Sequence, residues 1–531
     1  MDPCSPPRAP RAIALLEVTA RRLPDKTAVI DEHGSITYAA LRDRARRIGS
    51  ALIARGYRNK PVVIVLEKGI DALAAQLGVL YAGGCYVPID PIAAPRCLGA
   101  VCRALEGSAV VGDAETRALA TRAPEAEAFL DVHDLVSEPE DSGTLAEVAA
   151  RTIGSDPAYI LFTSGSTGVP KGVVVKNEAI VSFIGSFTAL FGIDETDVIG
   201  NQAPFDFDVS IKDIFGALAT GATLVILPRR LFSAPAALVD ALNAHRVTTL
   251  TWAVAALCLI SRLHGLDYAP LPHVRRVLFS GEVMPARHLA AWLEHLPHAE
   301  FANLYGPTEV TCNCLYHRID RSRAYRTGIP LGVPFLNHEV MLLDASGAPV
   351  TQAGEVGEIV VRSPELALGY IGDGARTREA FVQNPCNDRW CDPVYRTGDL
   401  AELTETGELM FRGRRDNQIK HLGHRIELEE IDLSLEAIAG VTRCRCAYDA
   451  HRQRIYAFYE GEGAASDIAA AAREFLPAHL MPSACIPVES MPLSKNGKVD
   501  RSALLAAHTP AAPARAHARR PHPATLSFTT G

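Results

Sequence analysis

Residues 161–172, LFTSGSTGVPKG, carry the strongest signal for the fold class of this chain. They overlap the end of an apolar run, residues 159–162 (YILF), which is typical of a strand that leads into a loop. Glycines allow backbone N–H groups to turn inward, the hydroxyls add donors, and Lys171 adds a compact positive charge. This combination suits polyphosphate binding, although the common spacing Gly-x-x-x-x-Gly-Lys-Ser/Thr is absent. Taken alone, the loop is equally consistent with a flexible surface connection.

The length and composition set the class of protein. A chain of 531 residues exceeds what one hydrophobic core usually supports, so two or more domains are expected. The net charge of −8 argues against a general nucleic-acid binder. No apolar run approaches the roughly 20 residues that cross a bilayer, and the N-terminal MDPCSPPRAPR lacks a secretory signal. We expect a cytoplasmic protein that binds neither nucleic acid nor membrane.

The twelve cysteines are expected to be reduced and mostly buried. Three close pairs could suggest a metal site, but none has Cys-x-x-Cys spacing with a partner pair. A structural metal is therefore not expected at these pairs, which are Cys312 and Cys314, Cys386 and Cys391, and Cys444 and Cys446.

Over the first four hundred residues, short β-rich runs alternate with helical runs. This alternation predicts a large N-terminal α/β domain with layered, mostly parallel sheets. Residues 339–414 change to strand, turn, strand, which predicts a small β-barrel-like subdomain. The clearest strand and helix pairs are residues 62–66 and 71–82, 223–227 and 236–245, and 276–280 and 285–295.

The end of the chain has a different character. A hairpin over residues 444–449 and 455–459, followed by a helix over residues 467–476, predicts a small α+β C-terminal domain. The Ala/Pro/Arg/His-rich remainder is expected to be disordered. The predicted domains are residues 1–415, 416–507 and a tail, 508–531.

Four further clusters follow the glycine-rich loop in order. They are NLYGPTE (303–309), YRTGDL (395–400), GRRD (413–416) with Lys420 and GHRIE (423–427), and PLSKNGKVDR (492–501). With all five clusters, the chain resembles the adenylate-forming enzymes, and among them the amino-acid adenylation domains of nonribosomal peptide synthesis. YVPID (86–90) and LPAHLMP (476–482) match further motifs, so the resemblance covers residues 36–505.

The resemblance implies a binding site for ATP and Mg²⁺. Tyr305 offers a ring face to adenine, Asp399 can accept from the ribose hydroxyls, and Thr308 contacts phosphate. Glu309 is the expected Mg²⁺ ligand, since this hard cation prefers oxygen. Alone, the Tyr-Gly-Pro-Thr-Glu stretch is better explained as a turn with a helix cap than as a nucleotide site. The expected ATP-binding residues are Thr163, Ser164, Gly165, Ser166, Thr167, Gly168, Lys171, Asn303, Tyr305, Gly306, Thr308, Asp399 and Arg414.

Two residues near the C-terminus receive mechanistic roles from the resemblance. By resemblance, Lys498 is the expected catalytic residue, which contacts the substrate carboxylate and the α-phosphate. The alternative interpretation is that Lys498 is simply part of a turn, since the preceding Asn-Gly pair is a hairpin signal. Asp416 resembles the hinge about which the C-terminal domain swings, and residues 420–423 would line the approach of the thiol. The family usually has a basic residue directly before Gly423, where this chain has Leu422, so the neighbouring His421 and His424 receive no role.

The run FDFDVS (205–210) places Asp208 where the family pairs a carboxylate with the substrate α-ammonium. Asp206 is the alternative if the register is shifted by two. By resemblance the pocket is lined by Asp208, Val209, Lys212, Thr251, Leu278, Ser280, Leu304, Cys312 and Asn313.

This lining favours a small polar, serine-like L-amino acid. Lys212 departs from serine-type pockets, which usually have an aromatic residue at that position, and a buried ammonium needs a partner. Either it pairs with Asp213 or Asp206, or it meets an acidic substrate such as aspartate, glutamate or phosphoserine.

The expected function is ATP-dependent activation of an amino acid as aminoacyl-AMP, followed by transfer to a phosphopantetheine thiol. No Gly-Gly-x-Ser attachment motif is present, so the expected partner is a separate carrier protein. The alternatives are an acyl- or aryl-CoA ligase, a D-alanine:carrier-protein ligase and, from another class, a non-catalytic nucleotide-binding module.

Overall fold

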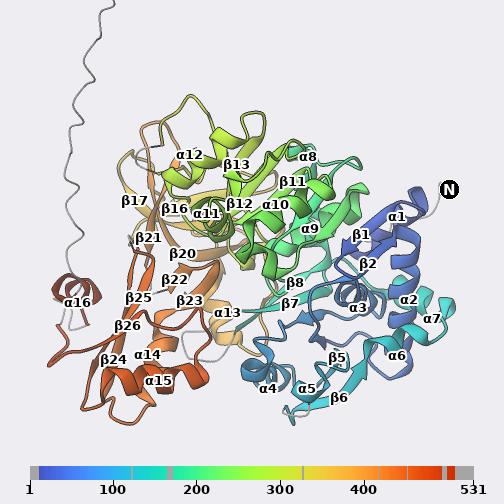
Figure 1. The fold of residues 1–531 in the computed structure, drawn as a ribbon, viewed down its shortest axis with the longest axis horizontal. Helices are drawn as coiled ribbons and strands as arrows, with labels where there is room; N and C mark the ends of the chain where they lie inside the picture. Colours follow the sequence, from blue (N-terminus) through green and yellow to red (C-terminus); the bar gives the residue numbers. More distant parts are fainter. Residues whose placement is uncertain are drawn as a thin grey trace, which may run out of the picture. The chain divides into compact units, whose positions relative to one another are not determined.

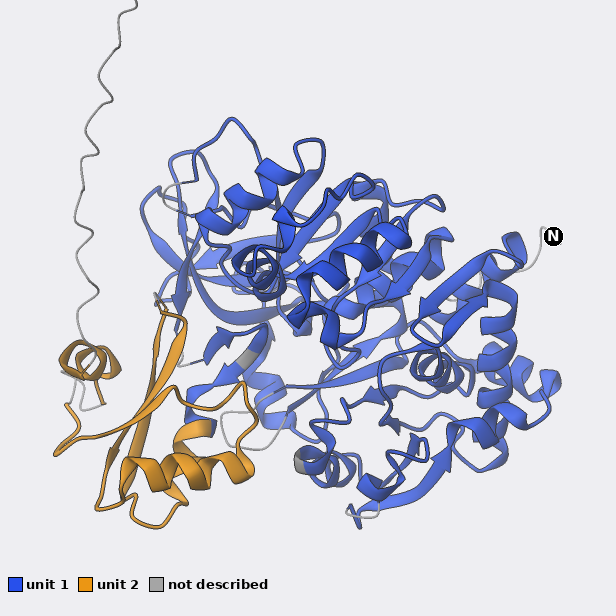
Figure 2. Cartoon of the chain, in the orientation of Figure 1, with its two compact units in different colours: residues 1–430 blue, residues 431–531 orange. Residues whose placement is uncertain are grey.

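The structure is a computed structural model that describes residues 11–120, 123–163, 171–325, 328–415, 418–450, 452–492 and 499–508. Its chain divides into two compact units, residues 1–430 and 431–531 (Figure 1; Figure 2). The predicted tail beyond residue 508 lies outside the described residues. The predicted boundary at residue 415 precedes a short hairpin that groups with the first unit.

A nine-stranded sheet, here called sheet A, forms one layer of the first unit. Its six central strands run parallel, and the strands at its edges pair antiparallel. The order is β15 (Val333–Pro334), β14 (Leu315–Arg318), β13 (Glu300–Tyr305), β12 (Arg276–Ser280), β11 (Thr249–Ala253), β9 (Val198–Asn201), β10 (Thr223–Ile226), β1 (Thr27–Asp31) and β2 (Gly34–Thr37).

A seven-stranded sheet, sheet B, forms a second layer. Five neighbouring strands run parallel, while β8 pairs antiparallel with both β7 and β18. The order is β18 (Gly369–Tyr370), β8 (Lys171–Lys176), β7 (Pro157–Thr163), β4 (Tyr86–Pro88), β3 (Val62–Ile64), β5 (Ser108–Gly112) and β6 (Ala126–Asp131).

The largest hydrophobic core lies between these sheets and joins one face of each to the helices between them. Separate cores cover the outer faces, with α10, α11 and α12 on sheet A and α4 on sheet B. The helices before the boundary are α1 (Ile13–Arg22), α2 (Tyr38–Ala54), α3 (Ile70–Tyr81), α4 (Ala94–Ala104), α5 (Arg117–Ala120), α6 (Val132–Ser137), α7 (Ser142–Arg151), α8 (Asn177–Phe191), α9 (Val209–Thr220), α10 (Pro235–Ala244), α11 (Val254–Arg262), α12 (Ala286–His295) and α13 (Gly374–Ala380).

Helix α9 is buried on all sides, as its sequence VSIKDIFGALAT indicates. Its first ten residues, 209–218, are all buried, and a helix that is largely apolar all round belongs in a core. The helix ends at Gly221, which adopts φ +90° and donates its N–H to Ala217 O at 2.9 Å. Such a left-handed residue is a common helix stop, and glycine adopts it without a Cβ penalty.

The predicted β-rich segment forms a five-stranded antiparallel sheet, sheet C, followed by a two-stranded hairpin. In the hairpin turn Leu422 and Gly423 both have positive φ, 53° and 83°, as a two-residue type I′ turn requires. The strands of sheet C are β16 (Glu339–Leu343), β17 (Val356–Arg362), β20 (Pro393–Leu403), β19 (Phe381–Gln383) and β21 (Leu409–Arg414), and those of the hairpin are β22 (Gln418–His421) and β23 (His424–Glu427).

The second unit is a small α+β domain. Its antiparallel pair, β24 (Arg443–Asp449) and β25 (Arg454–Glu460), confirms the predicted hairpin, and β26 (Ala484–Pro487) adds a parallel strand. Its helices are α15 (Ala465–Phe475), near the predicted helix, and α16 (Arg501–His508); α14 (Leu428–Glu436) spans the boundary. Among the described helices, none is long and apolar enough to cross a membrane.

One helix tests how strongly the outer core of sheet A stabilises the fold. Leu257 of α11 is fully buried, whereas Leu263, one residue past the end of α11, is 44% exposed. We expect Leu257→Ala to lower the free energy of unfolding by about 2–5 kcal/mol, because it leaves a cavity. The matched control Leu263→Ala should change it by no more than about 0.5 kcal/mol. Denaturant unfolding measures both, and equal losses would contradict the assigned core.

Candidate active site

Four of the predicted substrate-binding residues share one face of sheet A. In the register of β11, β12 and β13, Thr251 lies beside Leu278 and Ser280 lies beside Leu304. Side chains alternate between the faces of a sheet, so all four point to the same side. That side belongs to the core that contains α9, because Leu278 and Leu304 pack in the central hydrophobic cluster.

Asp208 directly precedes α9 and joins the predicted substrate residues to the predicted phosphate residues. Thr308 Oγ1 donates a hydrogen bond to Asp208 Oδ2 at 2.6 Å. Burial raises the pKa of Asp208 and the nearby Glu309 carboxylate adds to this rise, whereas the Thr308 hydrogen bond and Lys212 oppose it. Val209, also predicted to line the pocket, is the first residue of the helix and is 8% exposed.

Lys212 lies one helical turn after Asp208 and is fully buried. Its Nζ donates to Asn313 Oδ1 at 2.7 Å and to Ser280 Oγ at a longer 3.4 Å. The structure therefore brings three predicted pocket residues, Lys212, Ser280 and Asn313, into direct contact.

The alternative residue Asp206 occupies a different place. Its Oδ2 accepts from the backbone N–H of Asp90 at 3.3 Å, and it borders a cavity of about 570 Å³ that Lys68 and Arg229 also line. Burial raises the pKa of Asp206 to about 6. Thus Asp208, rather than Asp206, contacts Thr308.

The segment that connects β13 to β14 brings Cys312 and Asn313 to the pocket. A Cβ on Gly306 would lie 2.4 Å from the Cα of Asn313, so only glycine permits this close approach. Thr311 and Cys312 adopt φ +52° and +76°, which is strained for a β-branched residue such as threonine. The Thr311 hydroxyl donates to Glu365 O at 2.7 Å and Cys312 Sγ to Asp208 O at 3.2 Å.

The predicted phosphate and metal residues meet at the ends of β7 and β8. Thr163 pairs with Lys171 in the strand register, and Thr163 Oγ1 is buried with no hydrogen-bond partner among the described residues. Lys171 Nζ lies 3.4 Å from Glu309 Oε1, and Tyr370 OH donates to the same oxygen at 2.7 Å. Glu309 is fully buried. A buried carboxylate beside the Tyr370 hydroxyl and the Lys171 ammonium fits a divalent cation and phosphate.

The predicted nucleoside residues line a second part of the site. Tyr305 OH donates to Asp399 Oδ2 at 2.6 Å, and Arg414 forms an ion pair with Asp399 Oδ1. Asn303 donates its side-chain N–H to Pro330 O at 3.0 Å. Asn303, Tyr305 and Gly306 border a small apolar cavity of about 100 Å³ together with Leu331, Met410 and Phe411. The aromatic ring and the apolar wall suit a planar base.

Sequence reasoning missed several residues of this site. Tyr370 belongs to no recognised motif, yet its hydroxyl and ring contact Glu309 and Lys171, with Lys171 Nζ 5.3 Å from the ring centroid. Glu282 Oε1 accepts from Gly423 N at 2.8 Å, which fixes the β22–β23 turn. Lys420, expected near the approaching thiol, lies with its Nζ 5.4 Å from the centroid of the Tyr305 ring.

The remaining predicted site residues belong to segments that the structure does not describe. The catalytic Lys498, the hinge Asp416 and five loop residues lie outside the described residues; the loop residues are Ser164, Gly165, Ser166, Thr167 and Gly168.

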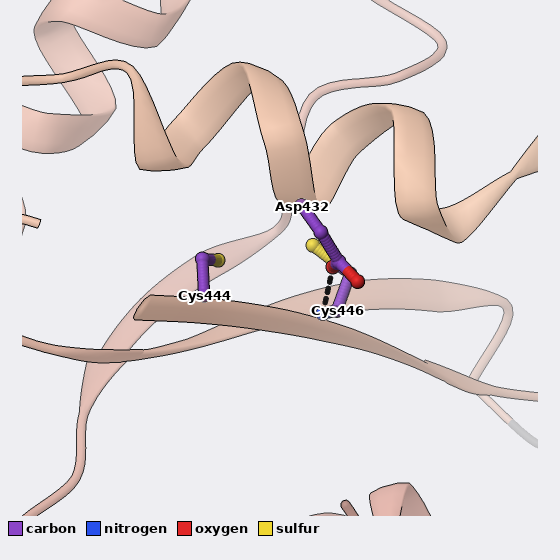
Figure 3. Close-up of side chains that lie close together, drawn as sticks. All are labelled: Asp432, Cys444 and Cys446. Atoms are coloured by element: carbon purple, nitrogen blue, oxygen red, sulfur yellow. Dashed lines mark hydrogen bonds between the residues drawn. The ribbon is translucent and has the colours of Figure 1, made fainter. Parts of the chain in front are cut away.

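Three side chains in the second unit lie close enough together to ligate a metal ion, but they already interact with neighbouring protein groups (Figure 3). The ligand atoms of Asp432, Cys444 and Cys446 lie within 4.8 Å of one another. However, Asp432 already accepts from Cys446 N at 2.5 Å and forms an ion pair with Arg501 at 2.9 Å. Burial raises the pKa of the Cys446 thiol, and the neighbouring Cys444 and Asp432 add to this rise. We interpret the cluster as a hydrogen-bonded part of the domain core.

Comparison with known proteins agrees with this geometry. Residues 16–371 match the model of the family described as AMP-binding enzyme. Syringomycin synthase SyrB1 of Pseudomonas syringae pv. syringae is 32% identical over 506 residues, which cover 91% of this chain and 80% of that protein. Bacitracin synthase 1 of Bacillus licheniformis is 30% identical over 499 residues; the match covers 92% of this chain but only 9% of that protein.

Two solved structures are similar over most of the chain. Holo-PA1221, described as an NRPS protein containing adenylation and PCP domains bound to a vinylsulfonamide inhibitor, has a TM-score of 0.79 at 26% identity. The match covers 94% of this chain and 84% of that one. IdnL1 has a TM-score of 0.77 at 29% identity and covers 91% and 98%, respectively. These likenesses confirm the predicted α/β domain followed by a small α+β domain.

The buried carboxyl group of Glu365 makes the stability of the fold depend on pH. Ser182 Oγ donates to its Oε1 at 2.7 Å, His338 Nε2 lies 3.3 Å from its Oε2, and burial raises the pKa of Glu365 from 4.5 to about 8. The folded protein therefore keeps a proton on Glu365 that the unfolded chain releases, so stability falls as pH rises from about 4.5 to 8.

In Glu365→Gln the pH-dependent contribution of this carboxyl group to the free energy of unfolding should disappear, while Ser182 and His338 remain. We expect the difference between the two unfolding free energies to change with pH by up to about 1.4 kcal/mol per unit between pH 5 and 8. Urea unfolding across this range measures it. Parallel curves for the two proteins would show that Glu365 does not titrate in this way.

Proposed function

The chain belongs to the AMP-binding enzyme family, and on that premise we propose that it activates an α-amino acid as aminoacyl-AMP and transfers it to a carrier-protein thiol. The adenylate-forming ligase activity is that of the family. The amino-acid substrate and the carrier partner are the parts proposed for this chain, which spans less than a tenth of the length of bacitracin synthase 1.

The observation that carries the proposal is the hydrogen bond between Thr308 and Asp208. In this contact the half-buried Asp208 carboxylate lies beside a residue proposed to hold phosphate. A desolvated carboxylate accepts strong, charge-assisted hydrogen bonds, so it favours a substrate with an α-ammonium over a fatty or aryl acid. The contact thus supports an amino acid whose carboxylate is held close to the nucleotide.

The chemistry requires two anions to be held together while charge develops on phosphate. The substrate carboxylate attacks the α-phosphate of ATP, and pyrophosphate leaves in line. We assign the β- and γ-phosphates to Lys171 and the loop that starts at Thr163, and adenosine to Tyr305, Asp399 and Arg414. Glu309 would hold Mg²⁺, which supplies positive charge to the phosphates when bound. Orientation and fixed charges of this kind provide the largest part of such catalysis.

Lys498 is proposed to supply the ammonium group that stabilises the charge developing at the reacting phosphate. Asp416 is proposed as the hinge of a mobile region, residues 416–507, that changes position before the second reaction. In that reaction the thiolate of a phosphopantetheine arm attacks the adenylate, an acyl–sulfur bond forms, and AMP leaves. We propose that the arm belongs to a carrier protein in trans.

The lining of the proposed pocket supports a small polar side chain. Thr251, Ser280 and Asn313 contribute polar groups, while Leu278 and Leu304 contribute apolar ones. Serine is the natural neutral candidate, and a short acidic amino acid is the charged one.

The proposal is tested by amino-acid-dependent exchange of pyrophosphate into ATP. We expect exchange with at least one amino acid, and a loss of about 10²–10³-fold in rate for Lys498→Ala, because a preorganised donor to developing charge is removed. Amino-acid binding by that variant should stay close to wild type. Lys60→Ala, at an exposed lysine, is the matched control and should keep full activity.

Thioester formation then separates the related ligases. A phosphopantetheinylated carrier protein should accept the aminoacyl group, whereas transfer to free coenzyme A would indicate an acyl-CoA ligase. A panel of D- and L-amino acids would reveal a D-alanine ligase. Folded protein that supports no exchange with any amino acid would contradict the proposal.

A further inference from the structure

Lys212 is a charged residue in a place where charge is costly. It is 1% exposed, in the interior of α9, and belongs to the largest fully buried side chains of the described chain. An ammonium group moved from water into such a core loses several kcal/mol of solvation unless it is paired. Burial accordingly lowers the pKa of Lys212.

The partners of Lys212 are neutral. Asn313 Oδ1 accepts at 2.7 Å and Ser280 Oγ lies at 3.4 Å, which together use two of the three N–H donors of the ammonium. No ion pair within the described residues includes Lys212. The pairing with Asp213 or Asp206 that the sequence left open is therefore not formed.

The neighbouring carboxylate is engaged elsewhere. Asp213 Oδ2 accepts from the side chain of Asn201 at 2.9 Å, and burial raises the pKa of Asp213 to about 7. Nearness to Asp213 and Asp208 opposes the lowering of the Lys212 pKa but does not produce a contact.

Asp208 and Lys212 together present two opposite charges to one site. They are four residues apart at the start of α9, and residues with this spacing lie on the same face of a helix, about 5–6 Å apart at Cβ. Lys212 is buried and Asp208 is half-buried, and neither forms an ion pair with an opposite charge among the described residues. A ligand that carries an ammonium for Asp208 and an anion for Lys212 would satisfy both.

We infer that the substrate is an α-amino acid with an anionic side chain, which Lys212 binds directly. The inference rests on the proposed function, which assigns the α-ammonium to Asp208. The α-carboxylate is not available to Lys212, because it must stay free to attack the nucleotide. The anion is therefore on the side chain, and Asn313 and Ser280 hold the ammonium group in place to receive it.

A neutral serine would fit the polar lining but would leave the ammonium without a counter-ion. A carboxylate or a phosphate monoester on a short side chain supplies one, and both groups accept from an ammonium. Leu278 and Leu304 are buried on the same face of sheet A as Ser280, which supplies no opposite charge to Lys212.

The test compares anionic amino acids with neutral amino acids of similar size in the full-length protein. The pairs are L-aspartate and L-asparagine, L-glutamate and L-glutamine, and O-phospho-L-serine and L-serine. Titration calorimetry without ATP measures binding, and pyrophosphate exchange measures kcat/KM. We expect one anionic member to exceed its neutral partner by about 30-fold or more, the effect of leaving a buried charge unpaired. The preferred pair identifies carboxylate or phosphate as the bound group.

Lys212→Met tests the residue, since methionine fills a similar space without charge. We expect it to abolish the preference for the anionic member, chiefly through a higher KM, while the exposed-site control Lys60→Met leaves the preference unchanged. Circular dichroism and thermal unfolding show whether Lys212→Met is folded. The preference of the wild-type protein for an anionic amino acid is measured without any variant, so it tests the inference even if Lys212→Met does not fold.

The outcomes separate the inference from the proposed function. Exchange with a neutral amino acid in preference to all three anionic ones would overturn the inference while supporting the function. Calorimetric binding of an anionic amino acid that depends on Lys212, without exchange, would support the inference and contradict the function. A preference that survives in Lys212→Met would overturn the role of this residue, and failure of every amino acid to bind would overturn both.

Discussion

The hydrogen bond from Thr308 to the carboxylate of Asp208 is the contact on which the site depends. Thr308 is adjacent to Glu309, which Lys171 and Tyr370 contact, while Asp208 leads into a helix that lies in the central core. One 2.6 Å contact therefore connects the proposed amino-acid end to the proposed phosphate end. If the two ends were not adjacent, the carboxylate could not be oriented toward the α-phosphate.

The fold maintains this contact at a cost in backbone strain and buried charge. Thr311 has a left-handed backbone that is unfavourable for a β-branched residue, and its hydroxyl is held by Glu365 O. Gly306 permits the two passes of chain to approach more closely than any other residue would allow. The left-handed residues Thr311 and Cys312 and the buried Lys212 thus lie beside a core that is otherwise largely apolar, and such departures from local preference are typical of a functional site.

Most of the architecture could be predicted from the sequence, because its signals are local. The alternation of strands with helices such as residues 71–82 follows from periodicity, and the ordered motifs identified the family. Contacts between distant segments could not be predicted in this way. Tyr370 contacts Glu309 because β18 pairs with β8, and no local pattern indicates that pairing. The partners of Lys212 likewise depend on the turn that brings Asn313 back beside Ser280.

The central claim, that Asp208 binds the α-ammonium of the substrate, is tested most directly by removing that ammonium. The preferred amino acid and its des-amino analogue can be compared in pyrophosphate exchange with wild-type protein and with Asp208→Asn. The account predicts that the wild type favours the amino acid by about 30-fold or more in kcat/KM and that the variant loses this preference. Equal use of both acids by the wild type, or an undiminished preference in the variant, would contradict it.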